Sequence, residues 1–391
     1  MIPYGRHFID EDDVQAVVEV LRHGWLTQGP KVPEFEAAVA RYVGARYAVA
    51  ISNATAGLHL ACLAAGVGPG DRVVTSPNSF VASANCAHSV GGVAEFVDIE
   101  PDSLNLDPLA LAERLRRGPT PKAVIPVHFG GLPCDMAAIA ASAAGVGAAV
   151  IEDAAHALGS RYRSGSRVGS CAHSDMAVFS FHPVKSIASG EGGIITTNRE
   201  DLYRRLLRLR SHGINKLDDP WEHPQHAAQD GEPNRWYYEM QELGFNCRLT
   251  DLQAALGLSQ LCKIDRFLAR RRELANRYRK AFKSAPAGIR AAQSGGWGES
   301  ANHLFVVRAP FDAHPGGRTS YMKKLQARGY VTQVHYIPIP MHPYYARLGC
   351  SMDALPEAAR YYREALSVPL FVGLTDEQQA RFVVDAIECM Q

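Results

Sequence analysis

The sequence predicts an α/β protein whose first domain is a mostly parallel sheet covered by helices on both faces. Two observations lead to this prediction. From residue 10 to about 200, short and near-continuous runs of Val, Ile and Ala alternate with amphipathic stretches. The chain has 391 residues, and a single hydrophobic core rarely supports a chain of that length. We therefore expect a large domain over residues 1–255 and a smaller α/β domain over residues 256–391.

The elements of the large domain follow in a regular order. Residues 10–24 form the first expected helix, with acids in its first turn and Gly24 just past its end. A second amphipathic helix closes on Gly44. Beyond it the expected strands are 47–52, 71–77, 93–99, 122–129, 147–153, 175–181 and 192–197, and the expected helices between them are 54–66, 81–91, 107–117 and 136–145. No G-x-G-x-x-G follows the first strand, so a dinucleotide-binding fold is not supported.

The second half of the chain is expected to begin with an Arg-rich helix over 200–212. Residues 213–240 are polar and aperiodic, which predicts a long exposed loop. A helix from 249 should lead into a basic helix over 266–282, with Leu274, Tyr278 and Phe282 as its apolar stripe and its arginines on a solvated face. Strand, helix and strand are then expected over 302–310, 318–329 and 331–336.

Composition narrows the class of protein. The formal net charge is +1, which favours neither nucleic acid nor an anionic membrane as partner. No stretch is apolar and long enough to span a bilayer, and the first residues do not resemble a signal segment. The eight cysteines stand singly, as in reduced proteins, so we expect a cytoplasmic enzyme. His223 and His226 lack further ligands nearby, so we expect no metal site.

Polar residues follow several of the expected strands, at the edge where open parallel sheets bind ligands. The first such junction is the run Ser52–Gly57, where small residues begin a helix and expose backbone N–H groups. This pattern predicts a phosphate cradle. Plain N-capping of the helix by Ser52, Asn53 or Thr55 is the structural alternative.

The second junction is Glu152–Asp153, two acids at the end of an apolar strand, with His156 three residues on. Side chains alternate along a strand, so only one acid can face the sheet-edge crevice, where a carboxylate needs a cation. An acidic helix N-terminus would explain the pair equally well.

Two further junctions contribute a lysine and an aromatic ring. Ser180 and Lys185 follow the strand over 175–181, and a strand-end lysine reaching water is the alternative there. Phe80 stands at a strand-to-helix turn, where it could stack on a planar ligand or pack on the helix that it precedes.

Together, the four junctions supply what pyridoxal 5'-phosphate requires. They offer a phosphate anchor, a carboxylate for the pyridinium nitrogen, a stacking face and a Schiff-base lysine. A desolvated lysine near a cationic ring has a depressed pKa and is a nucleophile.

At this point the chain resembles the DegT/DnrJ/EryC1/StrS family of fold-type I pyridoxal-phosphate aminotransferases that act on sugars. The resemblance rests on ordered segments over nearly the whole chain: "GWLTQGPKVPEFE", "SNATAGLHLA", "VIEDAAHALGS", "FSFHPVKSIASGEGGIITT", "LRSHGI", "LGFNCRLTDLQAALGLSQL" and "QVHYIPI". Cys247 departs from it, because an aromatic residue is common at that position of the family.

The resemblance implies roles for individual residues. Lys185 would hold the cofactor and transfer protons, and Asp153 would partner the pyridinium nitrogen. His156 would contact the ring oxygen, Phe80 would stack on the ring, and the phosphate would meet Ala54, Thr55 and Ser180, with Asn246 coming from the partner subunit of a homodimer. Substrate contacts are expected from Tyr4, Thr27, Gln28, Gln333, His335 and Tyr336.

The resemblance also implies a substrate class. The segments "FHPVK", "LGFNCRL", "NHLF" and "QVHYIPIPMHPYY" are similar to family members that aminate C4 of a UDP-linked 4-keto-6-deoxy-N-acetylhexosamine in pseudaminic acid synthesis, with glutamate as amino donor. Another 4-keto or 3-keto nucleotide sugar, of the bacillosamine type for example, is the alternative. A non-catalytic cofactor-binding regulator is a further alternative, although neither end of the chain has room for a DNA-binding domain. Family members with histidine in place of the lysine are dehydratases, and Lys185 argues against that activity.

Overall fold

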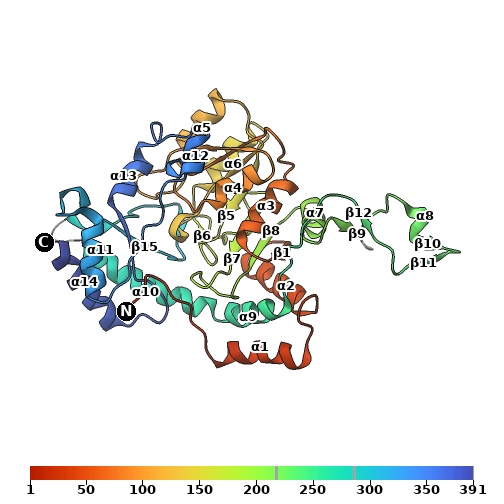
Figure 1. Cartoon of the computed structure of the whole chain (residues 1–391), viewed down its shortest axis with the longest axis horizontal. Coiled ribbons are helices and arrows are strands. Elements are labelled where there is room, and N and C mark those ends of the chain that lie inside the picture. The colour runs from red at the N-terminus through yellow and green to blue at the C-terminus, as the bar shows by residue number, and fades with distance from the viewer. Residues whose placement is uncertain (216–218, 284, 286–287, 391) are drawn as a thin grey trace.

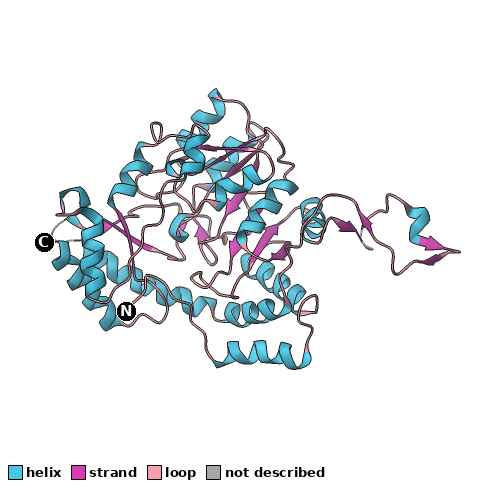
Figure 2. Cartoon of the chain, in the orientation of Figure 1, coloured by secondary structure: helices cyan, strands magenta, loops and turns pink. Residues whose placement is uncertain are grey.

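The protein is described here by a computed structural model that covers residues 1–215, 219–283, 285 and 288–390. A seven-stranded sheet forms its centre (Figures 1 and 2). The strands lie in the order β1 (Tyr47–Ile51), β8 (Gly193–Thr197), β7 (Met176–Ser180), β5 (Ala149–Asp153), β4 (Ala123–Ile125), β2 (Arg72–Thr75) and β3 (Val93–Phe96). Only β8 runs antiparallel to its neighbours within this sheet. The predicted mostly parallel sheet is therefore confirmed.

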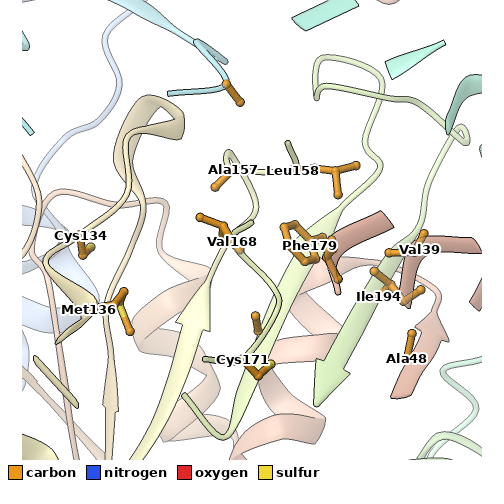
Figure 3. Packing of buried hydrophobic residues seen from close by; sticks show 14 of the residues in the cluster. Val39, Ala48, Cys134, Met136, Ala157, Leu158, Val168, Cys171, Phe179 and Ile194 are labelled. Atoms are coloured by element: carbon orange, nitrogen blue, oxygen red, sulfur yellow. The ribbon is translucent and has the colours of Figure 1, made fainter. Parts of the chain in front are cut away.

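Helices cover both faces of this sheet, because its strand residues alternate between two hydrophobic clusters. Val49, Val178 and Ile195 face one cluster, which also holds apolar residues of α3 (Ala54–Ala64), α4 (Ala82–Ser89) and α7 (Glu200–Arg210). Ala50, Phe179 and Ile194 face the other cluster, part of which is shown in Figure 3. That cluster holds residues of α2 (Lys31–Val43), α5 (Pro108–Arg117), α6 (Met136–Ala144) and α9 (Asp251–Cys262).

A second, antiparallel sheet of three strands lies beyond the large one. It consists of β13 (Arg290–Ala291), β15 (Phe305–Arg308) and β16 (Ala365–Val368). A separate hydrophobic cluster joins this sheet to α10 (Ile264–Phe282), α11 (Gly317–Ala327) and α14 (Asp376–Met390), and α13 (Pro356–Glu364) packs nearby. The expected division at residue 255 stays a prediction. In the structure, α9 runs across that position, and Ile2 bridges to Tyr330 of the later part.

Outside residues 213–240, the remaining elements are the N-terminal helix and several short segments. They are α1 (Glu11–His23), which packs on α9, η1 (Phe129–Gly131), β6 (Arg161–Tyr162), which pairs with β14 (Gly298–Glu299), η3 (Phe311–Ala313), η4 (Ile339–Met341) and α12 (Pro343–Arg347). Each helix and strand expected up to residue 212 is observed, with differences of one to four residues at the ends, whereas η1 and β6 were not expected.

Of the long exposed loop expected over residues 213–240, residues 216–218 lie outside the described residues. Residues 213–215 and 219–240 do not form a plain loop. They project from the body of the molecule (Figure 1) and contain short paired segments. The elements of this arm are β9 (Ile214–Asn215) paired with β12 (Glu239–Met240), β10 (Ala228–Gln229) paired with β11 (Glu232–Pro233), and α8 (Pro224–Ala227). The buried Glu239 helps to order the arm, because its carboxylate accepts the backbone N–H groups of Glu222 and His223, each at 2.8 Å. Exposure was predicted correctly, but these local hydrogen bonds were not.

Two other expectations were wrong. Residues 331–336 form no strand, and within this segment only Gln333 bridges to β16, at Ser367. The backbone groups that follow bond to side chains instead: the Val334 N–H donates to Gln333 Oε1 at 2.8 Å, and the His335 carbonyl accepts the Tyr361 hydroxyl at 2.6 Å. The arginines of α10 are not all solvated. Arg271 is 2% exposed and donates to the backbone carbonyls of His303 and Leu370, because it lies one helical turn before Leu274 on the buried face.

Candidate active site

A cavity of about 640 Å³ lies at the carboxyl ends of β5 and β7. This volume lies within the range of small-molecule sites. Seven of the predicted cofactor contacts line the cavity: Ala54, Thr55, Phe80, Asp153, His156, Ser180 and Lys185. Three of the predicted substrate contacts line it too: Tyr4, His335 and Tyr336. The four sequence junctions therefore meet at one site.

The N-terminus of α3 forms one wall of this cavity. Asn53 caps the helix by accepting the backbone N–H of Ala56 at 2.9 Å, and Ala54 and Thr55 follow it at the cavity surface. The predicted N-cap by Asn53 is confirmed, and the phosphate cradle at the same helix start stays a prediction. The positive end of the helix dipole and the unpaired N–H groups of its first turn favour an anion here.

Two glycines allow α3 and the strands beside it to approach each other closely. A Cβ on Gly57 would lie 2.3 Å from Ile51 Cδ1 and 2.7 Å from Val178 Cγ1, so only glycine lets α3 lie against β1 and β7. A Cβ on Gly193 would lie 2.9 Å from the Ala54 nitrogen, so only glycine lets β8 begin beside the start of α3. Both residues belong to segments that predicted the site.

Asp153 is the acid of the Glu152–Asp153 pair that faces the cavity. It is 7% exposed, and its Oδ2 accepts the hydroxyl of Ser83 on α4, which in turn lies 2.6 Å from Ser79 Oγ. The backbone N–H of Ala155 donates to Oδ1 at 3.1 Å. These contacts fix the carboxylate from both sides. Ser83 escaped the sequence analysis because nothing local marks a helical serine as the partner of a distant acid.

Glu152 points to the opposite side of the strand and is fully buried. Its carboxylate accepts hydrogen bonds from His128, Tyr162 and Ser174. Burial acts to raise the pKa of Glu152, but these three donors outweigh it and leave that pKa below 4.5. Glu152 therefore belongs to the core.

Lys185 enters the cavity from the loop after β7. Its backbone N–H donates to the His182 carbonyl at 2.9 Å, and no side chain among the described residues forms a hydrogen bond with its ammonium. Burial lowers the pKa of Lys185 from 10.5 to about 8, against an opposing effect of Asp153. A large fraction of this amine is consequently neutral and nucleophilic at mildly alkaline pH.

Three histidines line the same cavity as Lys185: His156, His303 and His335. The rings of His156 and His303 are 4.3 Å apart, and His335 Nδ1 lies 2.7 Å from Ser367 Oγ. Burial lowers the pKa of all three, that of His335 to about 4, and the charge of Lys185 adds to the effect, so they are neutral at pH 7. His303 was missed by the sequence analysis, although it stands in the quoted segment "NHLF".

Four predicted site residues do not line this cavity: Thr27, Gln28, Asn246 and Gln333 are exposed elsewhere on the chain. The loop with Thr27 and Gln28 is nevertheless held in a defined position. The buried Asp251 accepts the backbone N–H groups of Gly29 at 3.0 Å and of Lys31 at 3.1 Å.

The chemical groups that line the cavity fit pyridoxal phosphate. An anion site at the N-terminus of α3, a fixed carboxylate at Asp153, an exposed ring at Phe80 and an unpaired amine at Lys185 surround one space. His303 Nδ1 is buried without a hydrogen-bond partner among the described residues, as expected of a wall that meets a ligand. The fold and the site thus define an aminotransferase of fold type I.

Comparisons with known proteins place the chain more closely. It belongs to the DegT/DnrJ/EryC1/StrS aminotransferase family, whose model matches residues 7–388. The spore coat polysaccharide biosynthesis protein SpsC of Bacillus subtilis is 39% identical over 100% of this chain and 96% of its own length.

Two solved structures illustrate the likeness of the fold. Helicobacter pylori PseC, an aminotransferase involved in the biosynthesis of pseudaminic acid, has a TM-score of 0.88 at 29% identity, covering 100% of this chain and 99% of its own. The PLP form of the putative sugar aminotransferase Spr1654 of Streptococcus pneumoniae has a TM-score of 0.87 at 28% identity, covering 100% and 98%. The protein is therefore a pyridoxal-phosphate-dependent sugar aminotransferase, and the predicted family, fold class and cofactor are confirmed.

Proposed function

We propose that the enzyme transfers an amino group from glutamate to C4 of a UDP-linked 4-keto-6-deoxy-N-acetylhexosamine, as in pseudaminic acid synthesis. The observation that carries the proposal is the placement of His335 and Tyr336 on the cavity wall, because they belong to the segment "QVHYIPIPMHPYY" that most resembles enzymes of that pathway. The likeness to PseC, an aminotransferase involved in the biosynthesis of pseudaminic acid, supports a role in that pathway.

We propose that Asp153, Phe80 and the start of α3 hold pyridoxal phosphate in this cavity. When bound, the cofactor supplies a ring that accepts electrons, which makes it feasible to remove the proton beside an amine. Asp153, fixed by Ser83, favours a protonated ring nitrogen. Ala54, Thr55 and Ser180 would bind the phosphate. The expected contact of His156 with the ring oxygen stays a prediction, because both ring nitrogens of His156 are hydrogen-bonded within the protein, to Gly130 and Tyr336.

Lys185 is the group that moves protons in this proposal. Its Nζ, as a neutral amine, takes the proton from the carbon that bears the donor's amino group and later delivers one to C4 of the sugar. The lowered pKa supports both steps, because the protonated and the neutral form are both accessible near pH 8.

We propose that the working form is a homodimer with shared sites. Asn246 is exposed and bridges to Ser211 at the base of the arm, outside the cavity of its own chain. Several large apolar side chains of the arm and of the segment before Asn246 are exposed: Trp236, Tyr238, Met240, Leu243 and Phe245. Such a patch favours contact with another protein surface. The arm would then reach the neighbouring subunit, where Asn246 would meet the cofactor phosphate and the arm itself could cover the sugar nucleotide.

We also propose that the enzyme works in the cytoplasm. All eight cysteines are free thiols, which is typical of a reducing compartment. Among the described residues no helix is long and apolar enough to cross a membrane.

The substrate proposal is tested with a panel of UDP- and dTDP-linked 4-keto and 3-keto sugars, with glutamate as donor. Mass spectrometry detects the amine, and NMR of the product locates it on the ring. We expect the fastest turnover with the UDP-4-keto-6-deoxy-N-acetylhexosamine and amination at C4.

An alternative substrate is another keto sugar, such as a precursor of the bacillosamine type. The 39% identity to SpsC is the observation behind this alternative, because the name of that protein places it in spore coat polysaccharide biosynthesis and specifies no sugar. Faster amination of a different sugar in the panel, or amination at C3, would replace the first proposal with this one. Binding without turnover of any sugar would instead favour a non-catalytic regulator.

A further inference from the structure

Tyr336 and His156 form a hydrogen bond in the cavity wall, with Tyr336 Oη 3.2 Å from His156 Nε2. Either atom could donate in such a pair, and the direction depends on which nitrogen of His156 carries the proton. The surroundings of His156 decide this question.

The backbone N–H of Gly130 points at the other ring nitrogen, His156 Nδ1, at 3.3 Å. A backbone N–H can only donate, so Nδ1 must be the unprotonated acceptor. The ring is neutral, because burial and the charge of Lys185 lower the pKa of His156 well below 6.5. A neutral imidazole with an unprotonated Nδ1 carries its proton on Nε2.

The position of Gly130 is itself fixed. Gly130 and Gly131 both have positive φ, 63° and 94°, and a Cβ on Gly131 would lie 2.8 Å from the His156 carbonyl oxygen. The turn over Phe129–Gly131 therefore holds the N–H group against His156 by backbone geometry.

It follows that His156 Nε2–H donates to Tyr336 Oη. The Tyr336 hydroxyl therefore accepts this hydrogen bond and can donate its own proton to another acceptor. Across residues 1–215, 219–283, 285 and 288–390, no acceptor is hydrogen-bonded to that proton. Burial raises the pKa of Tyr336, so the hydroxyl stays protonated throughout the physiological range. Tyr336 lines the same cavity as Lys185, and the rings of Phe80 and Phe129 pack on it at 6.0 and 6.5 Å.

We propose that Tyr336 donates its hydroxyl proton in a hydrogen bond to the keto oxygen of the sugar substrate, and that His156 is the positioning residue that directs this proton into the cavity. The inference rests on the proposed function, since it assigns the group that polarises the carbonyl of that substrate. A preorganised donor of this kind stabilises the negative charge that develops on the keto oxygen when the amino group being transferred adds to the carbonyl carbon.

The first test uses the two half-reactions of the loaded enzyme, followed separately in single-turnover experiments. Tyr336→Phe removes the hydroxyl and keeps the ring. We expect a fall on the order of 10- to 100-fold in the half-reaction with the keto sugar, and little change in the half-reaction with the amino donor. Tyr344→Phe is the matched control, because Tyr344 is half exposed and lies outside this cavity.

His156 variants test the positioning role. His156→Gln keeps an N–H donor near the place of Nε2 and should retain most of the rate with the keto sugar, whereas His156→Leu should lose about as much as Tyr336→Phe. The double variant with Tyr336→Phe should lose no more than His156→Leu alone, because both changes remove one interaction.

The cofactor-free protein provides an independent measurement. Long-range ¹⁵N–¹H NMR of labelled histidine, assigned by the loss of one signal in His156→Gln, should show a neutral ring with its proton on Nε2. A proton on Nδ1 would overturn the inference.

Two kinetic outcomes would overturn it too. If Tyr336→Phe slows both half-reactions alike and shifts the visible absorption of the bound cofactor, the hydroxyl contacts the cofactor and not the sugar. If the wild type aminates a keto sugar and Tyr336→Phe does so equally fast, the inference fails while the proposed function stands. If the wild type aminates no sugar of the panel, the proposed function fails, and the inference that rests on it fails with it.

Discussion

Glu152 and Asp153 are neighbours in the chain, yet their carboxylates lie on opposite sides of strand β5 and in different environments. Asp153 lines the cavity and accepts the hydroxyl of Ser83, whereas Glu152 is fully buried among three hydrogen-bond donors. The alternation of side chains along a strand imposes this separation. Substitution of each acid should accordingly have a different consequence.

Asp153→Asn should lower kcat on the order of a hundredfold or more, because the amide keeps the shape of the carboxylate but removes the charge that favours a protonated ring nitrogen. Steady-state kinetics at saturating cofactor measure the effect. Asp201→Asn, on the exposed face of α7, serves as control. Near-normal turnover in Asp153→Asn would remove Asp153 from the proposed mechanism.

Glu152→Gln should lower stability more than activity. The donors His128, Tyr162 and Ser174 lose a charged acceptor, at a cost of about 1–3 kcal/mol in the free energy of unfolding. The folded-state pKa of Glu152 is lowered, so its contribution is complete above the unfolded value of about 4.5 and is lost as the pH falls through the folded value. Denaturant melts at pH 7 and at decreasing pH should show the difference between variant and wild type shrinking. An equal difference at all pH values would contradict this account of Glu152.

Local patterns were sufficient to predict the sheet, its covering helices and the four polar junctions. A helix such as α3 begins with small polar residues and a strand such as β5 is a continuous apolar run, and both signals lie within a few residues of sequence. The edge at which parallel strands end then brings Thr55, Asp153 and Lys185 together without further information.

Tertiary contacts were not predictable in the same way. Ser83 donates to Asp153 across 70 residues, and the Gly130 N–H donates to His156 Nδ1 across 26. Arg271 looks like any arginine of a basic helix until the carbonyls of His303 and Leu370 are seen around it. The strand expected over 331–336 has suitable residues, but the Val334 N–H and the His335 carbonyl bond to side chains of Gln333 and Tyr361. His335 and Tyr336 then line the cavity.

The reactivity of the cofactor-free enzyme should depend on pH through Lys185. Burial lowers the pKa of Lys185 to about 8, so the amine is mostly protonated below that pH and mostly neutral above it. The rate of covalent capture of added pyridoxal phosphate should rise with pH and level off with a midpoint about 8. A midpoint near 10.5, the ordinary value for lysine, would show that Lys185 is not desolvated as described.

Mixed dimers should reveal whether Asn246 acts in the neighbouring subunit. A Lys185→Ala chain and an Asn246→Ala chain are mixed under conditions that allow subunits to exchange. In the mixed dimer both lesions fall in one site, and the other site has Lys185 from one chain and Asn246 from the other. Activity should therefore exceed the sum of the two parents. An average of the parents, despite demonstrated exchange, would show that Asn246 acts within its own chain.

The central claim is that Lys185 is the lysine that holds the cofactor, and peptide mapping after borohydride reduction tests it most directly. Purified enzyme loaded with pyridoxal phosphate is reduced, digested and analysed by mass spectrometry. We predict that the cofactor is found on the peptide that contains Lys185, and that a correctly folded Lys185→Ala variant carries no label. Label on Lys263 or Lys323, with Lys185 unmodified, would contradict the site described here.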